Sequence, residues 1–379
     1  MADHDPPEII ARIASGVGPL DAAQWDGLGD GNPFVGHDFL SLLEASGSVG
    51  PGTGWTPAPI VIEREGGVVG ALPVYLKTHS QGEYIFDHHW ADAYERAGGA
   101  YYPKLQIAAP FSPVPGPRVL AHDESTARHL LHAAEAIVTQ NGLSSAHATF
   151  IDSHQVALFE DAGWLPREDV QFHWINRDYA DFDDFLAALS SRKRKAIRKE
   201  RAAAQAEVRI EHVTGDALTE AHWDIFWEFY QDTGARKWGQ PYLKREAFSL
   251  MGQTMADKVL LVLAWRDDTA VAGALNVIGP KRLYGRYWGC REDIPFLHFE
   301  LCYYQAIEAG IARGLKVVEA GAQGAHKLAR GYEPVVTHSA HFIADPGFRA
   351  AIADFLRRER AGNADDVRYL AGHAPFRKS

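Results

Sequence analysis

Residues 68–74 read Val-Val-Gly-Ala-Leu-Pro-Val, and residues 271–277 read Val-Ala-Gly-Ala-Leu-Asn-Val. Each stretch follows a strand-like run and a polar turn, and each is followed by a helix-like segment that ends at Gly-Leu before a further strand. Because this order occurs twice, we predict two copies of one α/β domain, residues 1–177 and 178–379, with mixed central sheets flanked by helices. Ligands often bind where two domains meet, so we expect the functional site at the junction of the copies.

The composition limits the class of protein. With 379 residues, 46% of them apolar, the chain is long enough for two domains with cores. Its net charge of -11 argues against a general nucleic-acid-binding protein. No apolar run has the length of a membrane span, and Met1 to Pro7 lacks the pattern of a signal peptide. Cys290 and Cys302 lack the spacing of a metal site or a disulfide framework, so we expect a cytoplasmic protein without a bound metal.

Hydrophobic periodicity and turn signals predict the elements of both copies. In the first copy we expect an entry helix within residues 8–50, a hairpin of residues 59–63 and 68–77, a helix at 125–140 with Ser125 as its N-cap, a strand at 146–151 and a short helix at 155–162. In the second copy we expect a basic helix at 182–207, strands at 259–265, 271–278 and 283–289, an amphipathic helix at 297–315 and a strand at 316–320. The first copy is longer between its hairpin and its helix, where residues 78–117 are irregular and rich in Tyr, Pro and His. Long insertions of this kind are usually functional.

This insertion holds a first candidate site. Asp87 precedes two histidines, the first of which is His88, and Trp90, Tyr102 and Lys104 follow. Adjacent histidines on a strand point to opposite faces, so at most one faces a given site. One hypothesis is a base–acid relay in which Asp87 orients an imidazole. The alternative is aromatic packing with solvent-facing histidines.

A second candidate site follows the strand at 316–320. Glu319 lies between apolar residues, and Gln323, His326 and Lys327 come soon after it. A carboxylate inside an apolar strand must be paired or face a cleft, because burying it alone is costly. We favour a functional site over the alternative, a structural ion pair.

The amphipathic helix places further polar residues at its start. On a regular helix His298, Cys302 and Gln305 share one face. Imidazole and carboxylate groups are common general bases, and His298 or Glu319 suits this role. The alternative is a surface His298 beside Glu300 as a helix-capping residue.

Two segments are rich in cations. In the helix at 182–207, Arg194 and Arg198 share one side and fit the phosphates of an acyl carrier, a tRNA or an anionic membrane; a solvated helix face is the alternative. In residues 236–242, Arg236, Trp238 and Tyr242 combine a cation with aromatic rings, which suits a phosphate, an acyl chain or simple cation–π packing.

The order of elements resembles the GNAT acyltransferase fold: antiparallel strands, a helix, a strand and a short helix that ends in Gly-Trp at residues 163–164. Two such copies resemble the FemAB-like tandem-GNAT proteins. Residues 86–91 (Phe-Asp-His-His-Trp-Ala), 110–116 (Pro-Phe-Ser-Pro-Val-Pro-Gly) and 287–290 (Tyr-Trp-Gly-Cys) are similar to a bacterial subgroup of N-acyltransferases related to GNAT-type ceramide synthases. The resemblance covers most of the chain from about residue 30 onward. The turns at 120–125 and 291–296 depart from the GNAT pattern, because neither is rich in the glycine that lets backbone N–H groups hold the pyrophosphate of coenzyme A.

The resemblance implies a fold of two tandem GNAT-like domains and an N-acyltransferase that joins an acyl group, carried by acyl-CoA or acyl-carrier protein, to an amine without a metal. It also implies that Lys327, or else Arg330, faces a substrate phosphate or a developing oxyanion. The most specific expectation is amide formation on a long-chain lipid amine, as in ceramide synthesis, by a cytoplasmic protein that binds the inner face of the membrane. One alternative is an aminoacyl-tRNA-dependent transferase that acts on a peptidoglycan precursor, with tRNA on the basic helix, and another is a non-catalytic module that binds lipids or precursors. The expected catalytic residues are His298, Glu319, Lys327, His88 and Asp87, and the expected substrate contacts are Arg330, Tyr332, Gln323, His326, Trp288, Glu300, Arg236, Trp238, Tyr242, Trp90, Tyr102, Arg194 and Arg198.

Overall fold

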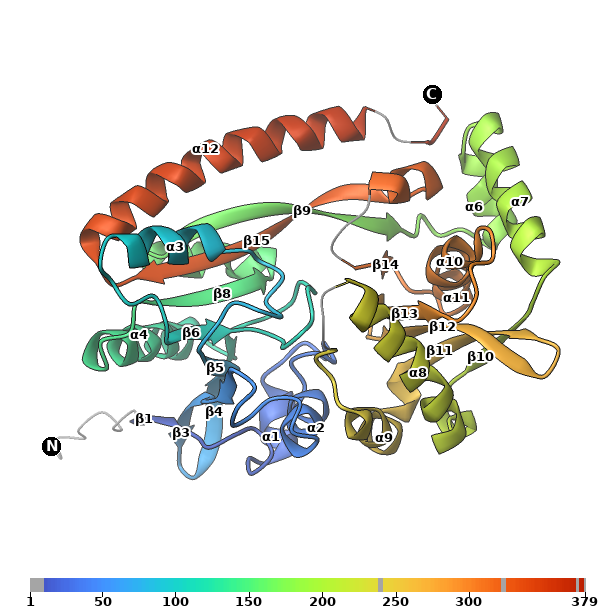
Figure 1. Ribbon diagram of the computed structural model, residues 1–379. Coiled ribbons are helices and arrows are strands. Elements are labelled where there is room, and N and C mark those ends of the chain that lie inside the picture. Colours follow the sequence, from blue (N-terminus) through green and yellow to red (C-terminus); the bar gives the residue numbers. More distant parts are fainter. Residues whose placement is uncertain (1–9, 238–240, 322–324, 373–374, 378–379) are drawn as a thin grey trace, which may run out of the picture. The chain divides into compact units, whose positions relative to one another are not determined.

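The computed structural model describes residues 10–237, 241–321, 325–372 and 375–377, and the chain divides into two compact units (Figure 1). Unit 1 consists of Met1–Asp169 and Thr337–Asn363, and unit 2 of Val170–Val336 and Ala364–Ser379. The predicted division after residue 177 differs from this partition, because residues 337–363 group with the N-terminal unit. The chain passes from one unit to the other inside β9 (Leu165–Ile175), β15 (Glu333–Ile343) and α12 (Pro346–Ala371).

Unit 1 contains two sheets. The first is antiparallel, with strand order β1-β3-β4-β7. The second joins β2, β5, β6, β8 and the unit 1 part of β15; β6 and β8 pair in parallel, and the other neighbours pair antiparallel. The strands are β1 (Ile10–Ile13), β2 (Trp55–Pro57), β3 (Ile60–Arg64), β4 (Gly67–Leu72), β5 (Val74–Lys77), β6 (Lys104–Ile107), β7 (Leu120–Ala121) and β8 (Ser145–Ile151), and the helices are α1 (Ala22–Gly27), α2 (His37–Ala45), α3 (His88–Arg96), α4 (Glu124–Gln140), η1 (Ser153–Gln155) and α5 (Val156–Asp161).

The second sheet of unit 1 has an apolar face and a polar face, because side chains alternate along a strand. The apolar face packs with α4 in the core and includes Leu105, Ile107, Ala146 and Ala148. The polar face is also buried, and it carries Lys77, Lys104, Gln106, His147 and His341. Charged side chains are almost never fully buried unless they are paired, so this face is specialised for polar contacts.

The two copies of the opening motif differ at one position. Pro73 separates β4 from β5, so the predicted strand at 68–77 is divided between the two sheets. Proline cannot donate a hydrogen bond within a central strand. In the second copy Asn276 takes this position, and β12 (Thr269–Ile278) continues with only a shift of register between Leu275 and Asn276.

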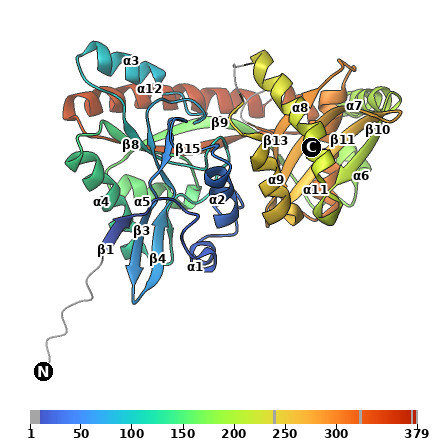
Figure 2. The ribbon, with the colours of Figure 1, turned by 60° about the horizontal axis from the view of Figure 1, so that its bottom comes forward.

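Unit 2 is built on a sheet with strand order β10-β11-β12-β13-β14-β9, in which β13 and β14 pair in parallel. Its core includes Trp174, Leu260, Leu283, Leu301 and Ile307. Residues of α7 and α11 line one groove, and Figures 1 and 2 show these helices from two directions. The remaining elements are β10 (Arg209–Val213), β11 (Val259–Arg266), β13 (Arg282–Cys290), β14 (Val317–Glu319), α6 (Phe182–Ala188), α7 (Ser191–Gln205), η2 (Gly215–Ala217), α8 (Glu220–Lys237), α9 (Arg245–Thr254), η3 (Ala256–Lys258), α10 (Leu297–Phe299), η4 (Glu300–Tyr304), α11 (Gln305–Ala312) and η5 (Ala325–Arg330).

The helix predicted from residue 297 contains a π turn, η4, between α10 and α11. A π turn holds more residues than an α turn and so rotates the side chains that follow it. The predicted common face of His298 and Gln305 is therefore wrong. His298 packs 5.2 Å from the Trp288 ring, whereas Gln305 donates to Glu300 at 2.7 Å.

Other local predictions were also wrong. Residues 8–50 contain β1, α1 and α2 in place of a single entry helix, and the insertion at 78–117 contains α3 and β6. The basic helix predicted at 182–207 is two helices, because Leu189 takes an extended conformation with ψ 156°. The N-cap of α4 is Asp123 and not Ser125, and its side chain accepts from the Thr126 N–H at 2.8 Å. No helix in the described part of the chain combines the length and apolarity of a membrane span.

Candidate active site

A network of charged side chains occupies the polar face of unit 1. The Lys104 ammonium donates to Ser80 Oγ and Glu83 Oε2, both at 2.8 Å, and to Asp87 Oδ2. Lys77 Nζ lies 3.8 Å from Glu83 Oε1. None of the four charged side chains is more than 3% exposed. Their burial is tolerable because two ammonium groups oppose two carboxylates and share hydrogen bonds.

Burial shifts the pKa values in this network in opposite directions. Burial lowers the pKa of Lys77 to about 7, although Glu83 opposes the shift. It raises the pKa of Glu83 to about 7, against the effect of Lys104. At Asp87 the attraction of Lys104 outweighs burial and holds the pKa below its usual range. Lys77 and Glu83 thus titrate near neutral pH, whereas Asp87 stays ionised.

The network continues through Tyr101 to two histidines. The Tyr101 hydroxyl donates to Asp87 Oδ2 at 2.6 Å and lies 3.3 Å from His147 Nε2, and His147 Nδ1 lies 2.7 Å from His341 Nδ1. Burial lowers the pKa of both imidazoles, that of His147 to about 3. His147 and His341 are not among the residues predicted from the sequence. Alternation of polar and apolar residues along β8 and β15 is the signal that could have found them.

His88 does not belong to this network. The two histidines begin α3 instead of lying on a strand, and both are exposed. Asp87 directs its Oδ2 atom to Tyr101 and Lys104, so the hypothesised relay from Asp87 to His88 is not formed.

Trp90 and Tyr102 lie beside the network. Trp90 is buried, with its ring centroid 4.8 Å from that of His341, and the half-buried Tyr102 hydroxyl lies 2.8 Å from Ser80 Oγ. Tyr102 is thus the member of this group nearest to solvent.

In unit 2, Glu319 ends β14 and is 3% exposed. Its Oε1 accepts from Arg282 at 2.9 Å, while its Oε2 lies 4.0 Å from His173 Nε2 and has no hydrogen-bond partner among the described residues. Burial raises the pKa of Glu319 to about 7, although Arg282 opposes the shift. Burial lowers the pKa of His173 to about 3. A carboxyl group that exchanges protons near neutral pH therefore lies beside a neutral imidazole.

Lys327 lies in the same neighbourhood of unit 2. It is 1% exposed, and its Nζ donates to the Gly321 carbonyl oxygen at 2.8 Å. Burial lowers its pKa to about 8. Lys327 and Arg282 both lower the pKa of His173 electrostatically, so they lie around the same imidazole as Glu319. A lysine with this pKa is able to stabilise negative charge or to give up a proton near neutral pH.

Arg330 is held in place by α7. Its NH2 group donates to both carboxylate oxygens of Glu200 at 3.0 Å, and the Tyr304 hydroxyl donates to the same carboxylate. The guanidinium also lies 3.4 Å from the centroid of the Phe299 ring. Arg330 is thus an anchor for η5, and the nearby Tyr332 is fully buried.

Three of the predicted residues gather in an aromatic cluster. The His298 ring lies 5.2 Å from Trp288 and 5.3 Å from Tyr303. The Tyr303 hydroxyl lies 2.8 Å from His326 Nε2. The π turn and η5 bring these rings together, which no spacing in the sequence indicates.

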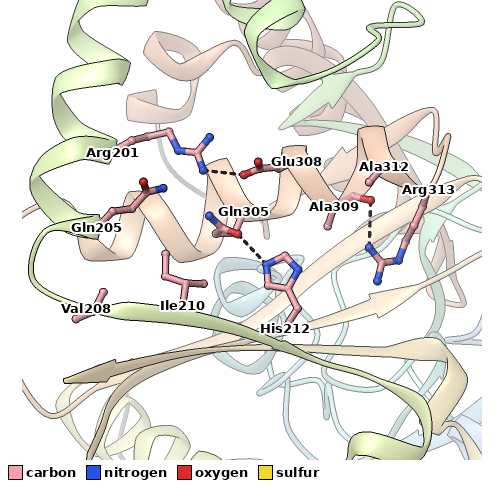
Figure 3. A pocket seen from close by; sticks show the side chains of 10 residues that line it. All are labelled: Arg201, Gln205, Val208, Ile210, His212, Gln305, Glu308, Ala309, Ala312 and Arg313. Carbon is pink, nitrogen blue, oxygen red and sulfur yellow. Dashed lines mark hydrogen bonds and ion pairs between the residues drawn. The ribbon is translucent and has the colours of Figure 1, made fainter. Parts of the chain in front are cut away.

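A groove of about 590 Å³ lies between α7, β10 and α11 (Figure 3). Beside it the buried Glu300 carboxylate accepts from Arg201, from Gln205 at 2.8 Å and from Gln305 at 2.7 Å, and Gln305 Oε1 lies 2.7 Å from His212 Nε2. Glu300, predicted as a substrate contact or a helix cap, ties α7 to η4. The groove is lined by Arg201, Gln205, Val208, Ile210, His212, Gln305, Glu308, Ala309, Ala312 and Arg313.

The cations of α7 differ in their surroundings. Arg198 is exposed and pairs with Asp183 at 2.8 Å, and Arg194 is half-buried. Arg192, Lys195 and Lys199 are exposed, and we call these three residues the basic face of α7.

The remaining predicted residues add little. Arg236 lies in α8 and not in a loop, and Tyr242 is half-buried. The side chain of Arg236, and all of Trp238 and Gln323, lie outside the described residues. The described ranges contain no group of three His, Cys, Asp or Glu side chains that could hold a metal.

The chain matches the FemAB-like family, described as peptidoglycan biosynthesis/recognition, over residues 16–378. The chain belongs to the FemAB-like family. No curated protein sequence matches it.

Solved structures share the fold at low sequence identity. FemX is 11% identical, with a TM-score of 0.55 over 88% of this chain and 98% of FemX. L-PGS from Bacillus licheniformis is 10% identical, with a TM-score of 0.55 over 90% of this chain and 98% of L-PGS. The C-terminal domain of a lysylphosphatidylglycerol synthetase from Agrobacterium fabrum is 11% identical, with a TM-score of 0.50 over 75% of this chain and 84% of that domain. At these identities the similarity concerns the fold alone, and it confirms the predicted α/β class of two tandem GNAT-like domains.

Proposed function

We propose that this FemAB-like protein is an aminoacyltransferase that forms an amide on an amine of a peptidoglycan precursor, with the activated group carried by a tRNA. One observation carries the proposal: the buried Glu319 carboxyl has an oxygen without a described partner and a pKa near 7, in the same unit as Lys327. The family match supports the peptidoglycan context. The lipid-amine interpretation drawn from the sequence finds no support in the comparisons, which favour the tRNA-dependent alternative.

The chemistry divides between two residues. An amine attacks only after losing a proton, and Glu319 accepts that proton at Oε2 when it is ionised. As the N–C bond forms, the carbonyl oxygen becomes negative and the Lys327 ammonium stabilises it. As the ester C–O bond breaks, the leaving hydroxyl oxygen takes a proton from Lys327, whose lowered pKa favours the transfer. His173 stays neutral and adds no competing charge beside Glu319.

The basic face of α7 supports a polyanionic donor. Arg192, Lys195 and Lys199 are exposed at intervals of three and four residues, which places them on neighbouring turns. The exposed remainder of α7 consists of Ser, Ala, Gln and Arg198, without a large apolar side chain. Helices that lie in a membrane surface bury Trp, Phe or Leu, so the composition of α7 suits RNA phosphates better than lipid.

The test is product formation by the purified full chain. Aminoacyl-tRNA is incubated with a peptidoglycan precursor that carries a free lysine amine, and a second arm combines palmitoyl-CoA with sphinganine. Mass spectrometry is expected to detect an amide in the first arm, with loss of product in Lys327→Met. An amide in the second arm alone would replace the proposed donor and acceptor, and no amide in either arm would overturn the transferase proposal.

Binding supplies an independent measurement. Lys195→Glu combined with Lys199→Glu is expected to weaken tRNA binding about tenfold or more and to flatten its dependence on salt, since each phosphate contact contributes to that slope. Lys244→Glu combined with Lys281→Glu, at two exposed lysines outside α7, is the matched change of surface charge and is expected to have a smaller effect.

A further inference from the structure

Phe296 breaks two local preferences at the start of α10. It occupies the N-cap position, where Ser, Thr, Asp, Asn or Gly is usual, and its side chain makes no capping hydrogen bond. Its backbone lies in the left-handed region, with φ 66° and ψ -1°, which is unfavourable for a bulky residue. Such departures from local preference are expected at functional sites.

The ring of Phe296 is not core packing. The residue is 40% exposed, and its ring lies 6.5 Å from that of Phe299 at an angle of 37°. Phe299 in turn lies 5.7 Å from the His326 ring and is covered on one side by Arg330. We call Phe296, Phe299 and His326 the aromatic shelf. Phe296 is its outer edge, and His326 is exposed.

We propose that the aromatic shelf binds the adenine base of the donor carrier by stacking. The inference rests on the proposed function in one respect, because it requires a donor that contains adenosine, as aminoacyl-tRNA and coenzyme A do and acyl-carrier protein does not. Exposed aromatic rings stack nucleic acid bases through their faces, with no need for an enclosed pocket. His326 also precedes Lys327 in η5, so a base on the shelf lies close to the lysine proposed to act on the transferred group.

The surroundings of Phe296 argue against a membrane contact. Phe296 is the exposed ring at the outer edge of the shelf, and a single ring buries too little apolar surface for stable membrane binding.

The experiment measures binding to the purified full chain by calorimetry, with adenosine monophosphate, coenzyme A and an RNA minihelix that ends in CCA as probes. Phe296→Ala is expected to weaken binding of adenosine monophosphate about tenfold, since removal of a stacking aromatic ring typically has an effect of this order. If Phe296→Ala also weakens the binding of coenzyme A or of the minihelix about tenfold, that probe identifies the carrier. Phe296→Trp is expected to retain binding.

Phe296→Gly separates stacking from backbone strain. Glycine accepts the left-handed conformation, so this variant is expected to melt at the same temperature or higher, and yet to lose binding as Phe296→Ala does. Phe86→Ala, which removes an exposed ring from unit 1, is the matched control and is expected to bind normally. Wild-type protein that binds none of the three probes, or Ala and Gly variants that bind within twofold of wild type, would overturn the inference. The inference would also be overturned if Phe296→Ala lost only its binding to phosphatidylglycerol vesicles, because Phe296 would then contact a membrane. Because no acceptor amine is present, failure of the transferase proposal would leave these results interpretable.

Discussion

Glu200 of α7 accepts hydrogen bonds from Arg330 of η5 at both carboxylate oxygens, each at 3.0 Å. Glu200 is the acidic residue within the cation-rich part of α7, and Arg330 ends the segment that carries Lys327. The pair therefore joins α7, which carries the basic face, directly to η5, which holds Lys327, the residue proposed to stabilise the carbonyl oxygen. We expect an anion bound to α7 to influence the position of Lys327 through this pair.

Replacing Glu200 tests this link. Glu200→Ala leaves the largely buried Arg330 without its partner and is expected to lower the free energy of unfolding by about 3 kcal/mol, as for other broken buried pairs. Urea denaturation checks the stability. Asp183→Ala removes the exposed ion-pair partner of Arg198, which lies on α7 as Glu200 does. The free energy of unfolding is expected to change by no more than about 0.5 kcal/mol in this variant. Equal effects of the two changes would contradict the anchoring role of Glu200.

The raised pKa of Glu319 predicts a pH dependence of stability. The folded protein binds a proton at this carboxyl up to about pH 7, whereas the unfolded chain releases it near the ordinary pKa of 4.5. The contribution of Glu319 to stability is therefore expected to fall as pH rises from about 4.5 to 7, by on the order of 3 kcal/mol. Glu319→Gln, which cannot titrate, should remove this contribution from the slope measured in urea titrations at successive pH values, whereas Glu83, whose pKa is also raised to about 7, contributes in both proteins. A variant that keeps the wild-type slope would assign it to another group.

The same carboxyl predicts a pH dependence of activity. If Glu319 accepts the proton of the amine, the wild-type rate rises with pH through about 7. Glu319→Gln is expected to lower kcat by about 10²- to 10⁴-fold and to lose this limb of the profile. If Glu319→Gln lowers kcat but keeps the rise of the rate through about pH 7, Glu319 only positions other groups.

Lys327 should separate activity from stability. Its burial lowers its pKa to about 8, so removing the ammonium relieves a cost of folding. Lys327→Met is expected to unfold at the same or a higher urea concentration, while kcat/KM falls by about 10²-fold or more, as with other groups that stabilise an oxyanion. Parallel loss of stability and activity would instead indicate that Lys327 acts through the folding of η5.

The network of unit 1 predicts a large effect of one lysine. Lys104→Met removes the ammonium that joins Glu83 and Asp87, and two buried carboxylates then lie without it. We expect a loss of about 3–5 kcal/mol. The triple variant Lys104→Met, Glu83→Gln and Asp87→Asn should recover part of this loss, because the unpaired charges are absent; denaturation of the single and triple variants is the measurement.

Gly289 predicts a steric effect within unit 2. A Cβ atom there would lie 2.1 Å from the Phe229 carbonyl oxygen, so α8 approaches β13 too closely for a side chain. Gly289→Ala is expected to cost about 1–3 kcal/mol or more. Gly362, in α12, has no atom within 4 Å of such a Cβ, and Gly362→Ala should stabilise the helix by about 0.5–1 kcal/mol. Opposite shifts of the melting temperature are expected.

Local patterns in the sequence were sufficient for many elements. The alternation and turns around β11, β12 and β13, and the apolar spacing of α4, lie near their predicted bounds, because these signals depend on neighbouring residues. Glu319 was predicted as a site residue because a carboxylate in an apolar strand needs a partner or a cleft, and the polar residues that follow it were included with it. The break at Leu189 and the π turn at Glu300–Tyr304 were not predicted, since contacts with other elements determine them.

The sequence by itself determined the duplication, the α/β class and the candidate Glu319, because repeats and charges within apolar runs are visible along the chain, and its resemblance to FemAB-like proteins added Lys327. Only the tertiary structure decided their partners. His173 and Arg282 lie far from Glu319 in sequence and meet it through strand pairing. Glu200 on α7 holds Arg330, which lies in the same segment as Lys327. It also moved the first candidate site from His88 to Lys104 and His147, because burial and the pairing of β6 with β8, and not proximity along the chain, bring charged groups together.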